Sequence, residues 1–350
     1  MPAGTDERRR VWVGGVDAIE VVQEAVPELG ARDLLVRMLI CGLCGSDKAG
    51  ASGKHAFFKP PYFPGHEVVG VVLEAGEQAG AAWVGRRVTV EPTLVCWECK
   101  QCRQGRENLC ENLQFFGCGF REGGMSELFV VPVERVHEVP ASFSDSQAVL
   151  IEPLATPVHA VRLAGDLTGK AVVILGAGTI GLLTVLAARH AGAKTIVSTD
   201  VLAGKRELAL SLGADSAVDA AAEHLSGTVR GELGESADVV FDCVSTGVTL
   251  SSALEMAVKG GSVVVVGGPR GPVSVDLPAL QEYQIRLQGS ATYTAEDFDR
   301  SIELISRGAV DARRLITSRF PMSRAADAFA AIAAGGEVKI VVEPDDGSAS

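Results

Sequence analysis

The stretch of sequence that decides the fold is Ala171-Val172-Val173-Ile174-Leu175-Gly176-Ala177-Gly178-Thr179-Ile180-Gly181. Its apolar first half predicts a buried strand, and the periodicity of Thr179–Ala191 predicts a helix directly after it. The first glycine permits a tight turn, the second lets the backbone approach a pyrophosphate, and the third lets helix and strand pack closely. The helix amino terminus then offers unpaired N–H groups to phosphates. We therefore predict a dinucleotide site formed by Gly176, Gly178, Thr179, Ile180 and Gly181.

The next apolar strand, Thr195–Asp200, ends on a carboxylate about twenty residues after the last glycine, the usual spacing in dinucleotide-binding chains. Asp200 would accept hydrogen bonds from the adenosine ribose, whereas a 2′-phosphate would meet its negative charge. Lys205 follows and would partly offset that charge. The competing interpretation is a flexible glycine turn beside a surface aspartate. The strand–turn–helix context favours the dinucleotide site, with NAD as the cofactor.

The 350 residues are enough for two domains. Strands and helices alternate over residues 156–290, which predicts a doubly wound parallel sheet. Residues 1–155 contain short strands broken by glycine and proline, which predicts an irregular, mostly antiparallel domain. Residues 291–350 are expected to return to this first domain. The predicted fold class is therefore α/β, with a mostly β domain beside a parallel-sheet domain.

The predicted elements follow from the same periodicities. Strands are expected at Leu34–Ile40, Val68–Leu73, Arg87–Val90, Glu127–Val131, Ala171–Leu175, Thr195–Asp200, Val239–Asp242, Ser262–Val266, Ile285–Gly289, Leu315–Phe320 and Val338–Val342. Besides the helix of the glycine motif, helices are expected at Leu250–Val258, Ala295–Ser306 and Ala325–Ala333.

Charge and hydropathy exclude several classes of protein. The formal net charge of −12 gives no general attraction for nucleic acid or anionic membranes. The basic run Arg8–Arg10 leads into apolar Val11–Val13, but residues 14–17 break this run, so no signal-peptide core forms. No stretch reaches the roughly 18–20 apolar residues that span a bilayer. We expect a cytoplasmic protein with neither nucleic acid nor membrane as a partner.

Four of the eight cysteines lie close together, between residues 96 and 110. In a large cytosolic chain such a cluster is typical of metal binding rather than of disulfides. The thiolates of Cys96, Cys99, Cys102 and Cys110 can close a tetrahedron around one zinc and leave no open position, as in structural sites. Four unrelated thiols and an iron–sulfur cluster are the alternatives. Nothing nearby indicates electron transfer, which favours zinc.

A second set of possible metal ligands is dispersed along the chain: Cys44, His66, Glu67 and Glu152. One thiolate, one imidazole and one or two carboxylates can hold a zinc with a position open for water or substrate. Such a Lewis acid polarises a carbonyl or lowers the pKa of an alcohol. Each residue also has a simpler interpretation: Cys44 as a small buried group, His66 as a polar residue beside a strand, and Glu152 as a helix cap or turn. Spacing alone does not join them.

A resemblance to a known family does join them. Five motifs follow one another along the chain: Gly42-Leu43-Cys44-Gly45-Ser46-Asp47, Gly65-His66-Glu67, the cysteine quartet, Glu152-Pro153-Leu154-Ala155 and the glycine motif. In this order, and from Arg10 to Pro344, the chain resembles the zinc-containing medium-chain dehydrogenase/reductase family. It most resembles the polyol branch, which includes sorbitol, threonine and butanediol dehydrogenases. The resemblance implies a GroES-like catalytic domain, a Rossmann domain, and Gly289–Thr292 beside the nicotinamide carboxamide.

The resemblance also implies how the dispersed ligands act. Cys44, His66 and a carboxylate would hold the catalytic zinc, with Glu67 as the first candidate. Glu152 would be a direct ligand or would act through a water. Ser46 would begin the proton relay from the substrate. Together with the cysteine quartet this makes two zinc ions per chain, and we expect a homodimer or homotetramer.

Ala49 departs from the family pattern. Related enzymes often have a histidine at this position, five residues after the zinc cysteine, where it passes the substrate's proton to solvent. Lys48, His55 or a chain of water molecules would have to replace it here. The segment Ala49–Tyr62 also differs from the family, and we expect it to line the substrate pocket.

These inferences predict a zinc-dependent dehydrogenase that moves a hydride between NAD(H) and a small secondary alcohol or ketone. The expected substrates are polyols, sugars, cyclitols, vicinal diols or 3-hydroxy amino acids. One alternative is a zinc-free, NADPH-dependent enone reductase on the same fold, which would prefer a basic residue at position 200. The other is a catalytically silent nucleotide-binding protein, which the loss of any zinc ligand would favour. The complete ligand set favours the dehydrogenase.

Overall fold

The computed structural model describes residues 7–119, 121–269 and 271–345. Its described residues form two compact units, of which the first combines the chain up to Glu152 with the chain from Asp311 onward. The second unit is Pro153–Val310. The sequence predicts the boundaries at residues 155 and 290, so the two divisions differ mainly in the segment before Asp311. No helix in the described part of the chain is long and apolar enough to cross a membrane.

The second unit is built on a six-stranded parallel sheet. Its strands are β10 (Ala171–Leu175), β11 (Thr195–Asp200), β12 (Ser216–Asp219), β13 (Ala237–Asp242), β14 (Ala257–Val265) and β15 (Arg286–Gly289). They lie in the order β12-β11-β10-β13-β14-β15, and every neighbouring pair is parallel. The order reverses between β10 and β13, and open α/β sheets bind their ligands beyond the carboxyl ends of the strands at such a reversal. The predicted Rossmann sheet is confirmed.

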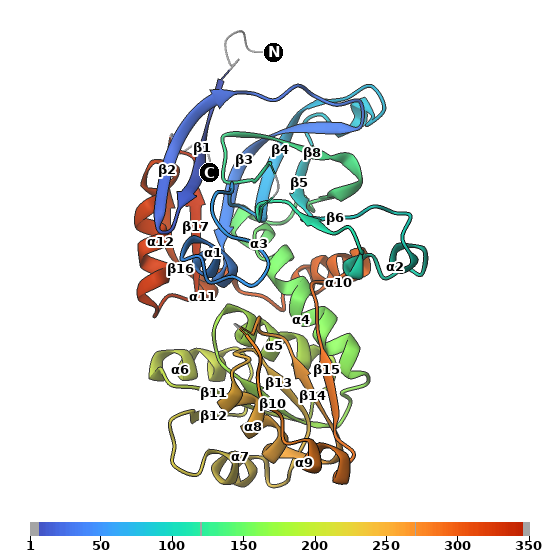
Figure 1. Ribbon diagram of the computed structural model, residues 1–350, viewed down its shortest axis with the longest axis vertical. Helices are drawn as coiled ribbons and strands as arrows, with labels where there is room; N and C mark the ends of the chain where they lie inside the picture. The colour runs from blue at the N-terminus through green and yellow to red at the C-terminus, as the bar shows by residue number, and fades with distance from the viewer. Residues whose placement is uncertain (1–6, 120, 270, 346–350) are drawn as a thin grey trace. The chain divides into compact units, whose positions relative to one another are not determined.

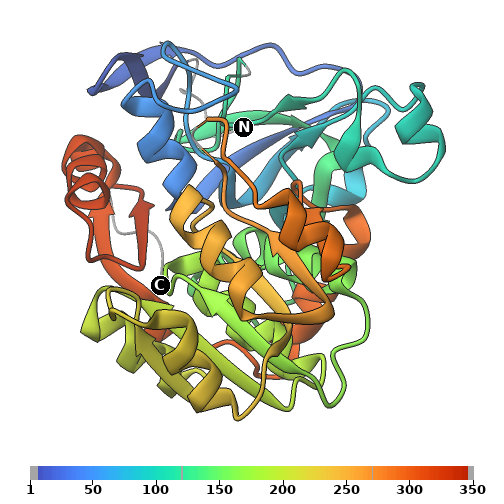
Figure 2. The same ribbon diagram turned by 60° about the horizontal axis from the view of Figure 1, so that its bottom comes forward.

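Helices cover both faces of this sheet (Figures 1 and 2). The helices are α4 (Ile151–Ala164), α5 (Thr179–His190), α6 (Ala203–Ser211), α7 (Leu225–Leu233), α8 (Gly247–Met256), α9 (Leu277–Glu282) and α10 (Ala295–Ser306). Helices α5 and α6 pack on β10, β11 and β12, and α7 packs with α8. The predicted helix Leu250–Val258 begins earlier and ends earlier as α8, because the backbone becomes extended at Ala257 and starts β14.

A buried ion pair joins α4 to α10 within the second unit. Asp297 is fully buried, and its carboxylate lies 2.8 Å from both His159 Nδ1 and Arg162 Nε. Burial alone would raise the pKa of Asp297, but the hydrogen bonds with His159 and Arg162 outweigh burial and lower it. Asp297 also accepts from the Thr294 backbone N–H in the capping box of α10. The sequence predicts α10 but not α4, which contains Pro157.

The first unit is mostly β-structure. Its strands are β1 (Glu7–Gly15), β2 (Ala18–Ala25), β3 (Asp33–Leu43), β4 (Glu67–Ala75), β5 (Arg87–Val90), β6 (Thr93–Leu94), β7 (Gln114–Phe115), β8 (Leu128–Pro132), β9 (Val136–Glu138), β16 (Ile316–Pro321) and β17 (Lys339–Glu343). Its helices are α1 (Gly45–Ala51), α2 (Lys100–Arg103), α3 (Asp145–Ala148), α11 (Ala312–Leu315) and α12 (Ala325–Ala334).

Strand β3 organises the main sheet of this unit, whose order is β16-β17-β3-β4-β5-β9 (Figure 1). One edge of β3 pairs with β4 along most of its length. Its other edge is shared, because Asp33–Arg37 pair with β8 and Cys41–Leu43 pair with β17. A strand from the carboxyl-terminal segment therefore completes the first sheet.

The amino-terminal hairpin of β1 and β2 was not predicted. Its basic run is not a solvated patch, because Arg8 and Arg10 are each only 2% exposed. Arg8 donates to Glu122 at 2.7 Å, and both arginines donate to Glu24 at 2.6 Å. The Arg10 guanidinium also lies 3.1 Å from the centroid of the Phe63 ring. Buried charges persist in proteins when they are paired in this way, so the run is part of the core.

The third glycine of the motif is expected to be essential for packing. A Cβ at Gly181 would lie 1.8 Å from the Gly176 carbonyl oxygen, whereas one at Gly204, in α6, meets nothing within 4 Å. Gly181→Ala should therefore lower the free energy of unfolding by about 1–3 kcal/mol. Gly204→Ala should raise it by up to about 1 kcal/mol, because alanine favours helix. Urea unfolding measures both; equal losses would contradict the packing argument.

Candidate functional site

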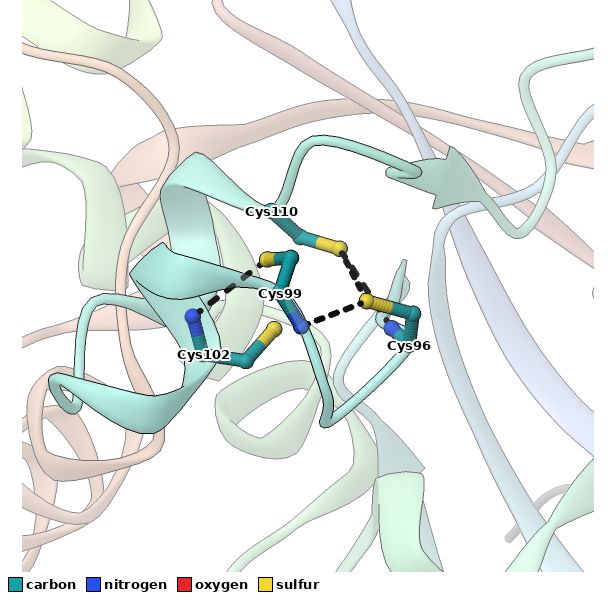
Figure 3. A group of neighbouring side chains, drawn as sticks. All are labelled: Cys96, Cys99, Cys102 and Cys110. Carbon is teal, nitrogen blue, oxygen red and sulfur yellow. Dashed lines mark hydrogen bonds between the residues drawn. The ribbon is translucent and has the colours of Figure 1, made fainter.

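The four cysteines of the quartet come together around α2 and the loops beside it. Their sulfur atoms all lie within 4.8 Å of one another, and those of Cys96 and Cys110 are 3.5 Å apart (Figure 3). Backbone amides point at them: Cys99 N–H donates to Cys96 Sγ at 3.4 Å and Cys102 N–H donates to Cys99 Sγ at 3.5 Å. All four are free thiols.

The chemistry of this donor set fits a closed zinc site. A tetrahedral zinc with bonds of about 2.3 Å holds its sulfur ligands about 3.8 Å apart, whereas disulfide sulfurs are about 2.05 Å apart. Hydrogen bonds from backbone amides favour the thiolate, and those of Glu98 and Cys99 lower the pKa of Cys96 to about 6. Burial instead raises the pKa of Cys102 to about 12. The spacing suits four sulfur ligands around one ion.

Three of the dispersed candidate ligands meet where β3 ends and β4 begins. Donor atoms of Cys44, His66 and Glu67 lie within 4.8 Å of one another. Cys44 is the residue before α1, immediately after β3, and Glu67 is the first residue of β4. The antiparallel register pairs Gly42 with Glu67 and thereby places the two segments side by side. A Cβ at Gly42 would lie 2.0 Å from Glu67 Oε2, so the carboxylate occupies space that only glycine leaves.

Lys339 is a member of this site that the sequence analysis missed. Its Nζ donates to both carboxylate oxygens of Glu67, at 2.7 and 2.6 Å, and both residues are 1% exposed. It also donates to the Leu43 carbonyl at 3.2 Å. The available signal was a lysine at the start of an otherwise apolar strand. Because β17 pairs with β3, a residue near the end of the chain supplies the counter-charge of Glu67.

Glu152 is not among the residues grouped with Cys44, His66 and Glu67, but its charge acts on the neighbouring Lys339. Its side chain is buried, at 5% exposure. Burial opposes the positive charge of Lys339, but Glu67, Cys44 and Glu152 outweigh burial and raise the pKa of this lysine. The structure therefore groups Glu67 with Cys44 and His66, and places Glu152 near enough to act on Lys339.

His66 stands between three further polar side chains. Its Nδ1 lies 3.4 Å from Cys118 Sγ and 3.8 Å from Asp47 Oδ1, while its Nε2 lies 3.5 Å from Ser46 Oγ. The other oxygen of Asp47 accepts the Cys44 backbone N–H at 2.9 Å. The sequence predicts a role for Ser46, which lies beside the cluster, but for neither Asp47 nor Cys118. Cys118 carried no recognisable signal because it belongs to none of the five motifs.

The residues considered for the missing histidine have other contacts. Lys48 Nζ donates to the Ala333 carbonyl at 3.0 Å, near the end of α12. His55 Nδ1 accepts the Phe57 backbone N–H at 3.2 Å, and the His55 ring packs on Phe58 with centroids 4.1 Å apart. Burial lowers the pKa of His55, with a smaller contribution from His66. His55 therefore packs against aromatic neighbours within the segment Ala49–Tyr62, which the sequence predicts to line the substrate pocket.

The dinucleotide motif sits at the carboxyl end of β10, before α5. Gly178 directly precedes α5 and has no side chain to cap it, and a helix amino terminus of this kind favours phosphate binding. Asp200 ends β11, and its two oxygens accept the backbone N–H groups of Ala177 and Leu202, each at 2.9 Å. The carboxylate therefore supports the glycine turn. Lys205 lies in the first turn of α6, after Asp200.

A small cavity lies at the carboxyl ends of β13 and β14. It has a volume of about 140 Å³ and is lined by Asp242, Ser245, Thr246, Leu250, Val265, Pro269, Gly271 and Val273. Gly289 ends the neighbouring β15. This edge of the sheet is where a doubly wound fold binds the second half of a dinucleotide.

Comparison with known proteins gives a matching family for each of the two units. Residues 30–141 match the model of the alcohol dehydrogenase GroES-like domain, and residues 179–307 match that of zinc-binding dehydrogenases. The chain is 33% identical to a sorbitol dehydrogenase of Arabidopsis thaliana, covering 94% of this chain and 93% of the relative. It is 31% identical to an L-idonate 5-dehydrogenase of Vitis vinifera, covering 95% and 93%.

A solved structure agrees as well. A zinc-binding dehydrogenase from Sinorhizobium meliloti 1021, bound to NADP, superposes with a TM-score of 0.89 at 35% identity, covering 97% of this chain and 99% of that one. The fold and the matches together define a zinc-dependent, nicotinamide-linked alcohol dehydrogenase. The chain belongs to the zinc-dependent medium-chain dehydrogenase/reductase family, in its polyol dehydrogenase branch. This assignment favours the zinc-dependent interpretation over the zinc-free reductase and the silent nucleotide-binding protein.

The quartet is expected to stabilise its lobe through the metal. Cys99→Ser should remove about one zinc per chain and lower the free energy of unfolding by several kcal/mol, because a closed site contributes its binding energy to folding. Cys243→Ser, which changes a half-buried thiol of the second unit, should leave the zinc content unchanged. Metal analysis and thermal unfolding of both proteins test this, and native zinc content in Cys99→Ser would contradict it.

Proposed function

We propose that this enzyme oxidises a secondary alcohol flanked by another polar group, and reduces the matching ketone, with NAD(H) as the hydride carrier. The candidate substrates are polyols, sugars, cyclitols, vicinal diols and 3-hydroxy amino acids. The observation that carries the proposal is the convergence of Cys44, His66 and Glu67. The names of the sorbitol and L-idonate dehydrogenases, which match over nearly the whole chain, support the substrate class.

The donor set fits a catalytic zinc rather than a closed structural one. Cys44, His66 and Glu67 would be the protein ligands, which leaves one tetrahedral position for water or substrate. When bound, the zinc supplies Lewis acidity that lowers the pKa of an alcohol or polarises a carbonyl. Lys339 would hold the Glu67 carboxylate in place, and the carboxylate retains lone pairs for a metal. Glu152 would act as an exchanging or water-mediated ligand.

The substrate class can be tested with a panel of secondary alcohols and ketones under both cofactors. We expect NAD-linked oxidation of at least one polyol, sugar, cyclitol, vicinal diol or 3-hydroxy amino acid, measured as absorbance of the reduced cofactor. Cys44→Ser should abolish turnover and remove one zinc per chain while the protein stays folded. Full activity with native zinc content in Cys44→Ser would show that the catalytic site is misassigned.

The preference for NAD is proposed to depend on Asp200. A 2′-phosphate would repel the carboxylate and disturb its hydrogen bonds to Ala177 and Leu202, at a cost on the order of 2–4 kcal/mol, or roughly 30- to 1000-fold. Lys205 offsets part of this cost. Asp200→Ser should therefore shrink the NAD/NADP ratio of kcat/KM by at least about tenfold.

Asp219→Ser is the matched control for this prediction. Asp219 stands in register with Asp200 on the neighbouring strand and lies 3.4 Å from Arg206. This substitution should change the ratio much less than Asp200→Ser does. An enzyme that favours NADP before any substitution would show that the cations of α6 outweigh the carboxylate.

The proton of the substrate is proposed to leave through Ser46 to water. Ser46 Oγ lies beside His66 and can accept a proton at the metal site, whereas Ala49 cannot carry one onward. Lys48 is engaged by Ala333, and His55 Nδ1 accepts a backbone N–H. These contacts favour water as the next acceptor, with His55 at most an optional helper.

Substitution can separate Ser46 from His55. Ser46→Ala should slow hydride transfer about 10²- to 10⁴-fold, as the loss of a general acid–base group does, and should shift the pH profile. His55→Ala should cost well under about tenfold. The rates of hydride transfer between about pH 6 and pH 10 make the comparison. Equal damage by the two substitutions would assign the missing histidine's role to His55.

We further propose that the enzyme works in the cytoplasm as a homodimer or homotetramer. Strand β15 is the last strand of its sheet and leaves an edge on which a second copy could pair. Light scattering on the purified enzyme would measure the oligomeric state.

A further inference from the structure

The imidazole of His66 lies between two sets of possible metal ligands. One set is the trio with Cys44 and Glu67, and the other is a trio with Asp47 and Cys118. In the second trio one donor atom from each residue lies within 4.8 Å of the others. Cys118 and Asp47 lie on the side of His66 Nδ1, whereas Ser46 lies on the side of His66 Nε2.

Asp47 is an incompletely satisfied member of the second trio. It is fully buried, and its Oδ1 has no hydrogen-bond partner among the described residues. The distance of 3.8 Å from Oδ1 to His66 Nδ1 is too long for a hydrogen bond. A buried carboxylate oxygen without a partner costs free energy, so a ligand that satisfies it is favoured.

The loop that carries Cys118 packs closely against His66. Gly117 and Gly119 both have positive φ, of 77° and 88°. A Cβ at Gly117 would lie 2.5 Å from the His66 backbone nitrogen, so a side chain there would push the loop away. The two glycines thereby allow Cys118 Sγ to approach His66 Nδ1 to 3.4 Å.

We propose that Asp47, His66 and Cys118 form a second metal position that binds an additional zinc or cadmium ion and inhibits the enzyme. Thiolate, imidazole and carboxylate are the ligands that zinc accepts, and three of them leave one position for water. Ideal tetrahedral bonds separate sulfur from nitrogen by about 3.6 Å and nitrogen from oxygen by about 3.4 Å. The observed 3.4 and 3.8 Å need only small side-chain rotations.

Inhibition follows because the two positions share His66. The inference rests on the proposed function in this respect: His66 is taken as a ligand of the catalytic zinc. An ion bound at Nδ1 removes the proton that this nitrogen carries in neutral imidazole when Nε2 binds a metal. It also withdraws electron density and moves the ring, which weakens the ligand at the catalytic position. The rival interpretation gives Asp47 and Cys118 only the role of orienting the ring, as partners of metal-bound histidines often do.

The test starts from enzyme that carries its full zinc complement. Cadmium and zinc are added separately, and equilibrium dialysis counts the ions bound while the ultraviolet thiolate-to-cadmium absorption reports a new sulfur ligand. We expect one additional ion per chain, with loss of activity over the same concentration range. Cys118→Ser should weaken this binding at least about tenfold and abolish the new absorption, because a hydroxyl replaces the thiolate. Asp47→Asn should weaken the binding without removing the absorption.

Cys243→Ser is the matched control and should bind the additional ion as the unsubstituted enzyme does. The proposal is overturned if no additional ion binds, or if Cys118→Ser binds it with unchanged affinity and absorption. The ion count does not depend on turnover, so these outcomes leave the proposed function standing. Conversely, an active Cys44→Ser enzyme with native zinc content would refute the proposed catalytic site whatever the additional ion does.

Discussion

The buried ion pair between Lys339 and Glu67 is the constraint on which the proposed catalytic site depends. Glu67 can be buried beside Cys44 only if its charge is compensated, because an unpaired carboxylate at 1% exposure would be protonated or expelled. The compensating charge comes from β17, which reaches the site because it pairs with the second half of β3. The pairing of the last strand with an early one is thus both a feature of the fold and a condition for the site.

The charges around this pair explain why a dication suits it. The carboxylates of Asp47, Glu67 and Glu152 are all buried, and Lys339 is the cation paired with Glu67. After burial, the charges of Asp47 and Glu67 are the largest reasons that the pKa of the neighbouring Cys41 thiol is well above its ordinary value. A zinc ion held by Cys44, His66 and Glu67 would add positive charge among these carboxylates and would stabilise a thiolate ligand.

Much of the fold could be predicted because its signals are local. The apolar run before Gly176 and the glycine spacing fix β10 and α5, and β5, β10, β11 and α10 have the predicted bounds. The errors arose where tertiary contacts override local pattern. The β1–β2 hairpin is stabilised by Arg8 and Arg10 pairing with Glu122, more than a hundred residues away, which no local window reveals. Helix α4 was missed because Pro157 lies inside it.

The two candidate metal sites show the same limit of sequence-based prediction. The quartet could be read from spacing, because four sulfurs in one short loop need little else to meet. The dispersed site could be assembled only through resemblance, which supplied motif residues but not their supports. Lys339 and Cys118 lie outside the motifs but contact Glu67 and His66, and each is contributed by a register or loop that spacing does not encode. Asp47 belongs to the first motif, but its position beside His66 became visible only in the structure. Residues that surround the motif residues of a candidate metal site are therefore found by geometry rather than by spacing.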